Sequence, residues 1–188
     1  MNKFTELVAL AHGATEEGEM IDFKSAANTE KPEFWCETVK DIVSFANTLG
    51  GAIIYGLNSD ASLSGEDCSS LRKIDQADLV NKIKKYTNVE LSKVNIVTVE
   101  RSGENLLAII VEPVTIPIPF TKPGTYETDH GKQKNAFSVG TIYVRHGSKS
   151  EPCNRDDLRI WLEARLDEIR ESWLGVSERW SRLRSIIR

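Results

Sequence analysis

Long hydrophobic runs and paired cysteines are both missing from this 188-residue sequence. A membrane-spanning helix needs about 20 predominantly apolar residues, and because no such run occurs, none is expected. The N-terminal segment MNKFTELVALAHGATEEGE also lacks the apolar core and cleavage site of a secretory signal. Cys36, Cys68 and Cys153 are too widely spaced for a disulfide framework or a paired-cysteine zinc site. These absences predict a cytoplasmic protein with reduced thiols and no membrane partner.

Familiar catalytic signatures are absent as well. The sequence contains no P-loop, GxSxG, HExxH or Cys-His zinc pattern, and no internal repeat. Its net charge is −4, so the chain as a whole does not attract nucleic acid. The charge is uneven, however: residues 1–112 have a net charge of −7, whereas residues 113–150 have a net charge of +3. This basic segment is compatible with a phosphate-bearing partner.

Apolar residues recur at helical or strand spacing along most of the chain. The pattern predicts three helices and a final helix capped by Asn154, the first three at about residues 3–12, 32–49 and 75–86. It predicts strands at residues 20–26, 52–57, 94–101, 105–113 and 139–148. This order is typical of an α+β domain with helices packed on a single mixed or antiparallel sheet. Residues 1–152 are expected to form this domain, and residues 153–188 a C-terminal helical extension.

In the stretch SFANTLGGAIIYGLN, residues 44–58, an apolar helix meets an apolar strand at Gly50-Gly51. Glycine takes a positive φ without strain, so Gly50 is expected just beyond the helix end. The strand is apolar at every position, which is typical of a central strand covered on both faces. A polar loop containing Asp60 follows it. Further along, residues 113–137 carry four prolines and are expected to form a long loop without secondary structure.

Three stretches together resemble the Schlafen-type AlbA-like domain. They are IDFKSA at residues 21–26, VSFANTLGGAIIYGL at 43–57 and GTIYVRHGSKSEP at 140–152. The Ala-Asn-Thr-x-Gly-Gly string is the most specific of them. The resemblance implies the mixed fold of that family and a role in binding DNA or RNA. It also implies a second possibility, since a subset of the family cleaves structured RNA such as tRNA with three carboxylates and a divalent metal.

Carried over to this sequence, the family pattern assigns the metal-binding carboxylates to Glu17, Asp22 and Asp60. The implied ion is Mg²⁺ or Mn²⁺, and both prefer oxygen ligands. Asp22 stands where the family pattern has glutamate, so this ligand is one methylene shorter. Glu16 and Glu19 lie in the same segment, and either could take the place of Glu17. From the residues alone, the alternative is a solvated acidic turn and an ordinary loop aspartate.

Lys24 follows Asp22 by two positions, so in a regular strand both side chains point to the same face. As part of a catalytic group, Lys24 is expected either to pair with a carboxylate or to contact the scissile phosphate. Arg145 either positions a phosphate or braces the carboxylate loop, and His146 is either a general base or a strand-end histidine. The residues expected to contact the nucleic-acid backbone are Lys122, Lys132, Lys134, Arg145, His146 and Lys149.

Two functions are therefore open. The first is a metal-dependent endoribonuclease that acts on tRNA or other structured RNA, suited by analogy to phage defence or a toxin role. The second is a non-catalytic module that binds DNA or RNA or takes part in assembly. Animal nucleases of the family join two lobes in one chain, whereas this sequence has one. A homodimer or larger assembly through the C-terminal amphipathic helix is therefore expected.

Overall fold

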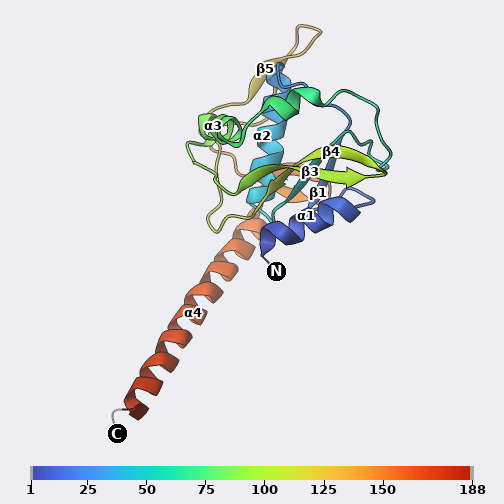
Figure 1. Ribbon diagram of the computed structural model, residues 1–188. Coiled ribbons are helices and arrows are strands. Elements are labelled where there is room, and N and C mark those ends of the chain that lie inside the picture. Colours follow the sequence, from blue (N-terminus) through green and yellow to red (C-terminus); the bar gives the residue numbers. More distant parts are fainter. Residues whose placement is uncertain (1, 187–188) are drawn as a thin grey trace. The chain divides into compact units, whose positions relative to one another are not determined.

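The computed structural model describes residues 2–186, and the side chains of its last helix as far as residue 173. The chain divides into two compact units, Met1–Pro152 and Cys153–Arg188, and each is described by itself. The last two residues of the predicted C-terminal extension, 187–188, lie outside the described residues. The first unit contains α1 (Lys3–Gly13), β1 (Ile21–Lys24), α2 (Pro32–Ala46), β2 (Gly51–Tyr55), the short 3₁₀ helix η1 (Ser69–Lys73), α3 (Gln76–Thr87), β3 (Val94–Arg101), β4 (Glu104–Val111), β5 (Thr125–Glu127), β6 (Gln133–Asn135), β7 (Tyr143–His146) and β8 (Lys149–Pro152) (Figure 1).

The main sheet has four strands in the order β1-β2-β4-β3. β1 and β2 run parallel, whereas β4 is antiparallel to both of its neighbours. β3 and β4 form the predicted hairpin, whose turn residues Ser102 and Gly103 both have a positive φ. The α+β class and the mixed sheet are therefore confirmed. The strand predicted at residues 139–148 does not join this sheet, because β7 pairs with β8 in a separate two-stranded ladder.

Helices cover both faces of the main sheet. On one face, α1 packs over Ala52 and Ile54 of β2. On the other face, α2 packs over Ile53 and Tyr55 of the same strand. Because successive residues of a strand point to opposite faces, a strand covered on both sides must be apolar throughout. The continuous apolar run of β2 is explained in this way, and all five of its residues are buried.

The two glycines between α2 and β2 serve different purposes. Gly50 has a φ of +76°, which is the conformation expected for a glycine just beyond a helix end. Gly51 allows a close approach, since a Cβ atom there would lie 2.6 Å from the carbonyl oxygen of Met20 and would overlap the ring of Phe45. A side chain at position 51 would therefore push β2 away from the end of α2 and from the residue that precedes β1.

The segment at residues 113–137 contains secondary structure, so the prediction of a long loop without secondary structure was wrong. β5 and β6 pair as a short antiparallel hairpin that extends away from the main sheet in Figure 1. The hydroxyl of Tyr126 in β5 donates a hydrogen bond to Oε1 of Glu37 in α2, at 2.8 Å. Nearer the start of the segment, the Asn47 side chain bonds both the N–H and the C=O of Ile118. These contacts hold the segment against α2.

The second unit contains α4 (Arg155–Ile186). Asn154 caps it as predicted, because its Oδ1 accepts a hydrogen bond from the N–H of Asp156 at 2.7 Å. In return, Oδ2 of Asp157 accepts from the N–H of Asn154 at 2.7 Å. No helix in the described part of the chain is long and apolar enough to cross a membrane. Several large apolar side chains of α4 are exposed, namely Leu158, Ile160, Leu162, Leu166 and Trp173.

Candidate functional site

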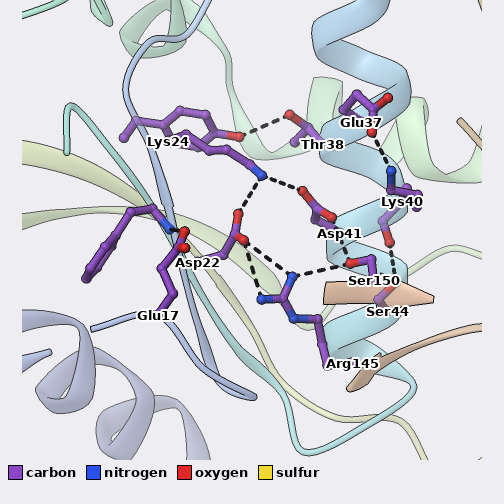
Figure 2. A network of polar contacts seen from close by, with 12 residues as sticks. Glu17, Asp22, Lys24, Glu37, Thr38, Lys40, Asp41, Ser44, Arg145 and Ser150 are labelled. Carbon is purple, nitrogen blue, oxygen red and sulfur yellow. Dashed lines mark hydrogen bonds and ion pairs between the residues drawn. The ribbon is translucent and has the colours of Figure 1, made fainter. Parts of the chain in front are cut away.

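An ion pair on β1, between the buried Asp22 and the partly exposed Lys24, is the centre of the site. Ile21 and Phe23 of this strand belong to the cluster under α1, so the alternating residues Asp22 and Lys24 face α2. The Nζ of Lys24 lies 2.7 Å from Oδ2 of Asp22 and 3.0 Å from Oδ2 of Asp41 in α2. Figure 2 shows the lysine between the two carboxylates. Pairing with a carboxylate, one of the two expectations for Lys24, is what the structure contains.

Arg145 of β7 approaches Asp22 from the other side. Its Nη1 and Nη2 lie 3.3 and 3.4 Å from Oδ1 of Asp22, and Nη2 also donates to the carbonyl oxygen of Gly18 at 3.2 Å. The guanidinium stacks over the ring of Phe45, at 4.5 Å from the ring centroid. The Arg145 side chain is only 1% exposed, so in this structure it braces the carboxylate segment.

Asp41 and Ser150 complete the network. The hydroxyl of Ser150, in β8, donates to Oδ1 of Asp41 at 2.7 Å and accepts from Nη1 of Arg145 at 3.3 Å. We call the five side chains of Asp22, Lys24, Asp41, Arg145 and Ser150 the buried ion network. Its members come from β1, α2, β7 and β8, so the network links the main sheet and the β7–β8 ladder to α2 (Figure 2).

The charges of the network balance, with two carboxylates and two cations. Burial, and after it the negative charge of Asp41, raises the pKa of Asp22, against the opposing effect of Lys24 and Arg145. Burial works against the charged form of Lys24, but Asp41 and Asp22 outweigh it and raise the pKa of the lysine. Both shifts favour a bound proton, so the network holds protons more tightly than the separate groups would. Lys24 is therefore a fixed cation at neutral pH.

The network opens onto a cavity of about 310 Å³. The ammonium group of Lys24 forms ion pairs with the carboxylates of Asp22 and Asp41, and it also lines this cavity. The Lys24 side chain is 35% exposed, so it can be reached from solvent. The lining residues are Asp22, Lys24, Glu37, Lys40, Asp41, Arg145, Ser148, Lys149, Ser150 and Glu151.

The three carboxylates that the family pattern assigns to a metal lie in different settings. Glu17 accepts a hydrogen bond from the N–H of Phe23 at 3.0 Å, so it lies beside β1 (Figure 2). Asp60 is exposed, and its Oδ1 accepts hydrogen bonds from the hydroxyl of Ser62 at 2.5 Å and from the N–H of Ser62 at 3.0 Å, inside its own turn. These hydrogen bonds to Ser62 lower the pKa of Asp60. Among the residues that the structure describes, no group of three or more Asp, Glu, His or Cys side chains is arranged to hold a metal ion.

The four predicted lysine contacts share one property. Each is exposed, and none forms an ion pair within residues 2–173: Lys122, Lys132, Lys134 and Lys149. His146 differs from them, because its Nδ1 lies 3.3 Å from Oε2 of Glu151. Lys149 also lines the cavity, so it lies beside the buried ion network.

Asp41 and Ser150 were missed by sequence reasoning. A usable signal existed for Asp41, since it lies directly before the apolar pair Ile42-Val43 and is the one charged residue among the buried residues of α2. A buried carboxylate needs a charged or hydrogen-bonding partner, so its position predicts a cation nearby. No signal identified Ser150, because its role depends on the pairing of β7 with β8.

The chain matches the family model "Schlafen, AlbA_2" over residues 17–154. It therefore belongs to the Schlafen AlbA_2 family, and the suspected resemblance is confirmed. The crystal structure of the DIP2311 protein from Corynebacterium diphtheriae is similar in fold, with a TM-score of 0.52 and 21% sequence identity. The match covers 85% of this chain but 28% of that one, so this chain spans less than a third of the length of that protein.

A second solved structure also matches. It is the solution NMR structure of the N-terminal domain of a RecG-related protein from Nitrosomonas europaea, with 20% identity and a TM-score of 0.37. The match covers 82% of this chain and 95% of that domain. Among curated proteins, none matches the chain significantly.

Proposed function

We propose that the first unit binds nucleic acid through the exposed lysines Lys122, Lys132, Lys134 and Lys149. The observation that carries this proposal is that none of the four ammonium groups has an ion-pair partner within the described part of the chain. Lys31 and Lys84, by contrast, pair with Asp129 and Glu90 and so have less charge to offer. Unpaired lysines favour phosphate contact, because binding releases counterions from the nucleic acid.

The buried ion network would act as an anchor beside this surface. A phosphate oxygen that reaches the cavity at Lys149 would meet the ammonium group of Lys24, which lines the same cavity. Because Asp22 and Asp41 hold the ammonium in place, Lys24 would lose little side-chain entropy on binding. Contacts of this kind fix the position of a nucleic acid without reading its sequence.

Fluorescence anisotropy with labelled tRNA and with a labelled DNA duplex tests the proposal. The variant Lys132→Gln/Lys134→Gln/Lys149→Gln should bind both probes at least tenfold more weakly than the wild type at low salt. The matched control is Lys73→Gln/Lys84→Gln/Lys93→Gln, which removes the same number of exposed charges from other segments. An equal loss of affinity in both variants would mean that only the net charge matters, and it would contradict binding through Lys122, Lys132, Lys134 and Lys149.

A metal-dependent endoribonuclease is the second candidate, favoured by the position of Glu17 beside the strand that carries Asp22. The three carboxylates do not form a ready ligand set, because both oxygens of Asp22 face cations and Asp60 bonds within its own turn. A Mg²⁺ or Mn²⁺ ion at Asp22 would have to compete with Lys24. When bound, such an ion would polarise a phosphate and lower the pKa of a water molecule.

Assays of tRNA cleavage and of tRNA binding distinguish the two candidate functions. Nuclease activity predicts that tRNA is cut in the presence of Mn²⁺, that EDTA stops the reaction, and that Glu17→Gln and Asp60→Asn abolish it. Binding alone predicts intact tRNA and an affinity that EDTA does not change. Cleavage that is equal in the wild type and both variants would point to a contaminant and exclude the three-carboxylate assignment.

A further inference from the structure

Glu37 of α2 contacts two parts of the molecule at once. Its Oε1 accepts a hydrogen bond from the hydroxyl of Tyr126 in β5, at 2.8 Å. Glu37 also lines the cavity at the buried ion network. Its Oε2 pairs with Nζ of Lys40, three residues further along the helix and also at the cavity (Figure 2). Glu37 therefore links the β5–β6 hairpin to the edge of the cavity.

The pairing of β5 with β6 decides which way the lysines of the hairpin point. Lys134 lies directly opposite Tyr126, and opposite residues of an antiparallel pair have their side chains on the same face. Tyr126 is buried in the cluster that includes α2, so this face of the hairpin is turned towards α2. The pairing continues to Lys132, whose carbonyl oxygen accepts from the N–H of Thr128 at 2.9 Å. Because Lys132 and Lys134 are two positions apart, both lie on the face that bonds Glu37.

The charge of Glu37 does not oppose a phosphate here, because Lys40 balances it. A second contact holds the turn of the hairpin, where Oδ2 of Asp129 lies 2.7 Å from Nζ of Lys31. Both of these side chains are exposed, so water and salt weaken their ion pair. The bond between Tyr126 and Glu37 is less exposed, and it is the contact that sets the distance from the hairpin to the cavity.

We propose that Glu37 is a positioning residue for nucleic-acid binding. Its hydrogen bond to Tyr126 holds the hairpin, and with it Lys132 and Lys134, beside the cavity. Lysines on a fixed hairpin lose less conformational freedom when they meet a phosphate than lysines on a hairpin that moves. This inference rests on the nucleic-acid binding proposed above, and it assigns a role to a carboxylate that touches no phosphate itself.

Two neutral substitutions at position 37 isolate the hydrogen bond. Glu37→Gln and Glu37→Ala remove the same charge, but only the glutamine can still bond the hydroxyl of Tyr126. In fluorescence anisotropy with labelled tRNA, Glu37→Ala should bind roughly threefold to tenfold more weakly than Glu37→Gln, as expected for the loss of one hydrogen bond. Equal affinities of the two variants would overturn the proposal.

Tyr126→Phe removes the same bond from the other side. It should weaken tRNA binding by a similar factor relative to the wild type. The matched control is Tyr143→Phe, which removes a hydroxyl from β7 and should leave the affinity unchanged. Equal loss of affinity in both tyrosine variants would contradict a specific role for the bond to Glu37.

The background Lys132→Gln/Lys134→Gln distinguishes positioning from a general loss of stability. If Glu37 acts through these lysines, the difference between Glu37→Gln and Glu37→Ala should disappear when both lysines are replaced. A difference that persists unchanged would overturn the positioning role and leave binding through the lysines intact. A wild type that binds no tRNA, or that loses no affinity when the lysines are replaced, would refute the proposed function and this inference with it.

Discussion

The Nζ of Lys24 lies 2.7 Å from Oδ2 of Asp22, two residues away on the same strand. This ion pair occupies the carboxylate that the family pattern assigns to a metal ion. A metal ion could bind Asp22 only if it displaced Lys24 from this carboxylate. With Asp22 and Asp41 as its partners it is a fixed cation that can meet a phosphate.

Asp41 should be required to hold Lys24 in place. The substitution Asp41→Asn keeps the size of the side chain and a possible bond to Ser150, but it removes the charge that faces the ammonium group. We expect the free energy of unfolding to fall by about 1–3 kcal/mol, the cost of leaving a polar partner unsatisfied, because Lys24 is partly exposed and can still be solvated. Denaturant unfolding measures this change. Glu66→Gln, at an exposed position, is the control and should change little; equal stability of Asp41→Asn and the wild type would contradict the role of Asp41.

The raised pKa of Asp22 gives a pH dependence with a definite sign. Burial, followed by the charge of Asp41, makes the folded protein bind this proton more tightly than the unfolded chain does. The stability contributed by Asp22 is therefore greatest below the pKa of the unfolded chain and is lost as the pH rises through the raised pKa. Relative to Asp22→Asn, the wild type should gain stability as the pH falls from neutral towards about 4.

Asp60 supplies a control of opposite sign for this measurement. Its hydrogen bonds to Ser62 lower its pKa, so its contribution is present above the pKa of the unfolded chain and is lost in acid. Denaturant unfolding at a series of pH values gives the free energy of unfolding of the wild type, Asp22→Asn and Asp60→Asn. Plotted against pH, the difference between the wild type and Asp22→Asn and the difference between the wild type and Asp60→Asn should have slopes of opposite sign. Two slopes of the same sign would contradict the assignment for Asp22.

Gly51 should not tolerate a side chain. Its Cβ would meet the carbonyl oxygen of Met20 and the buried ring of Phe45, neither of which can move without displacing β2. We expect Gly51→Ala to destabilise the protein by about 1–3 kcal/mol, as overpacking does in other cores. Gly13→Ala is the matched control, because no atom lies within 4 Å of its Cβ position. Thermal unfolding compares the two, and a harmless Gly51→Ala would refute the close approach.

Much of the fold could be predicted from local patterns. The apolar run of β2, the glycine after α2 and the Ser102-Gly103 hairpin are all confirmed, because each depends on neighbouring residues in the chain. The β5–β6 hairpin was missed, since three exposed polar residues in β6 give no hydrophobic alternation to read. The pairing of β7 with β8 was missed for a similar reason.

The site was predicted less completely than the fold. That Asp22 and Lys24 share a face follows from their spacing on a strand, and the structure contains their ion pair. The family pattern assigned Asp60 and Asp22 to one metal site, and β1, which carries Asp22, does pair in parallel with β2, which precedes Asp60. The chain after β2, however, folds into a tight turn in which Ala61 has a positive φ and the Asp60 carboxylate bonds Ser62. The sequence does not reveal such a turn.

Salt dependence tests nucleic-acid binding through the exposed lysines most directly. The logarithm of the association constant for tRNA should fall linearly with the logarithm of the salt concentration, with a slope of about 0.7–0.9 for each phosphate contact. Loss of Lys132, Lys134 and Lys149 to glutamine should reduce that slope by about 2–3, whereas the control that replaces Lys73, Lys84 and Lys93 should leave it unchanged. Identical slopes for the wild type and both variants would contradict nucleic-acid binding at this surface.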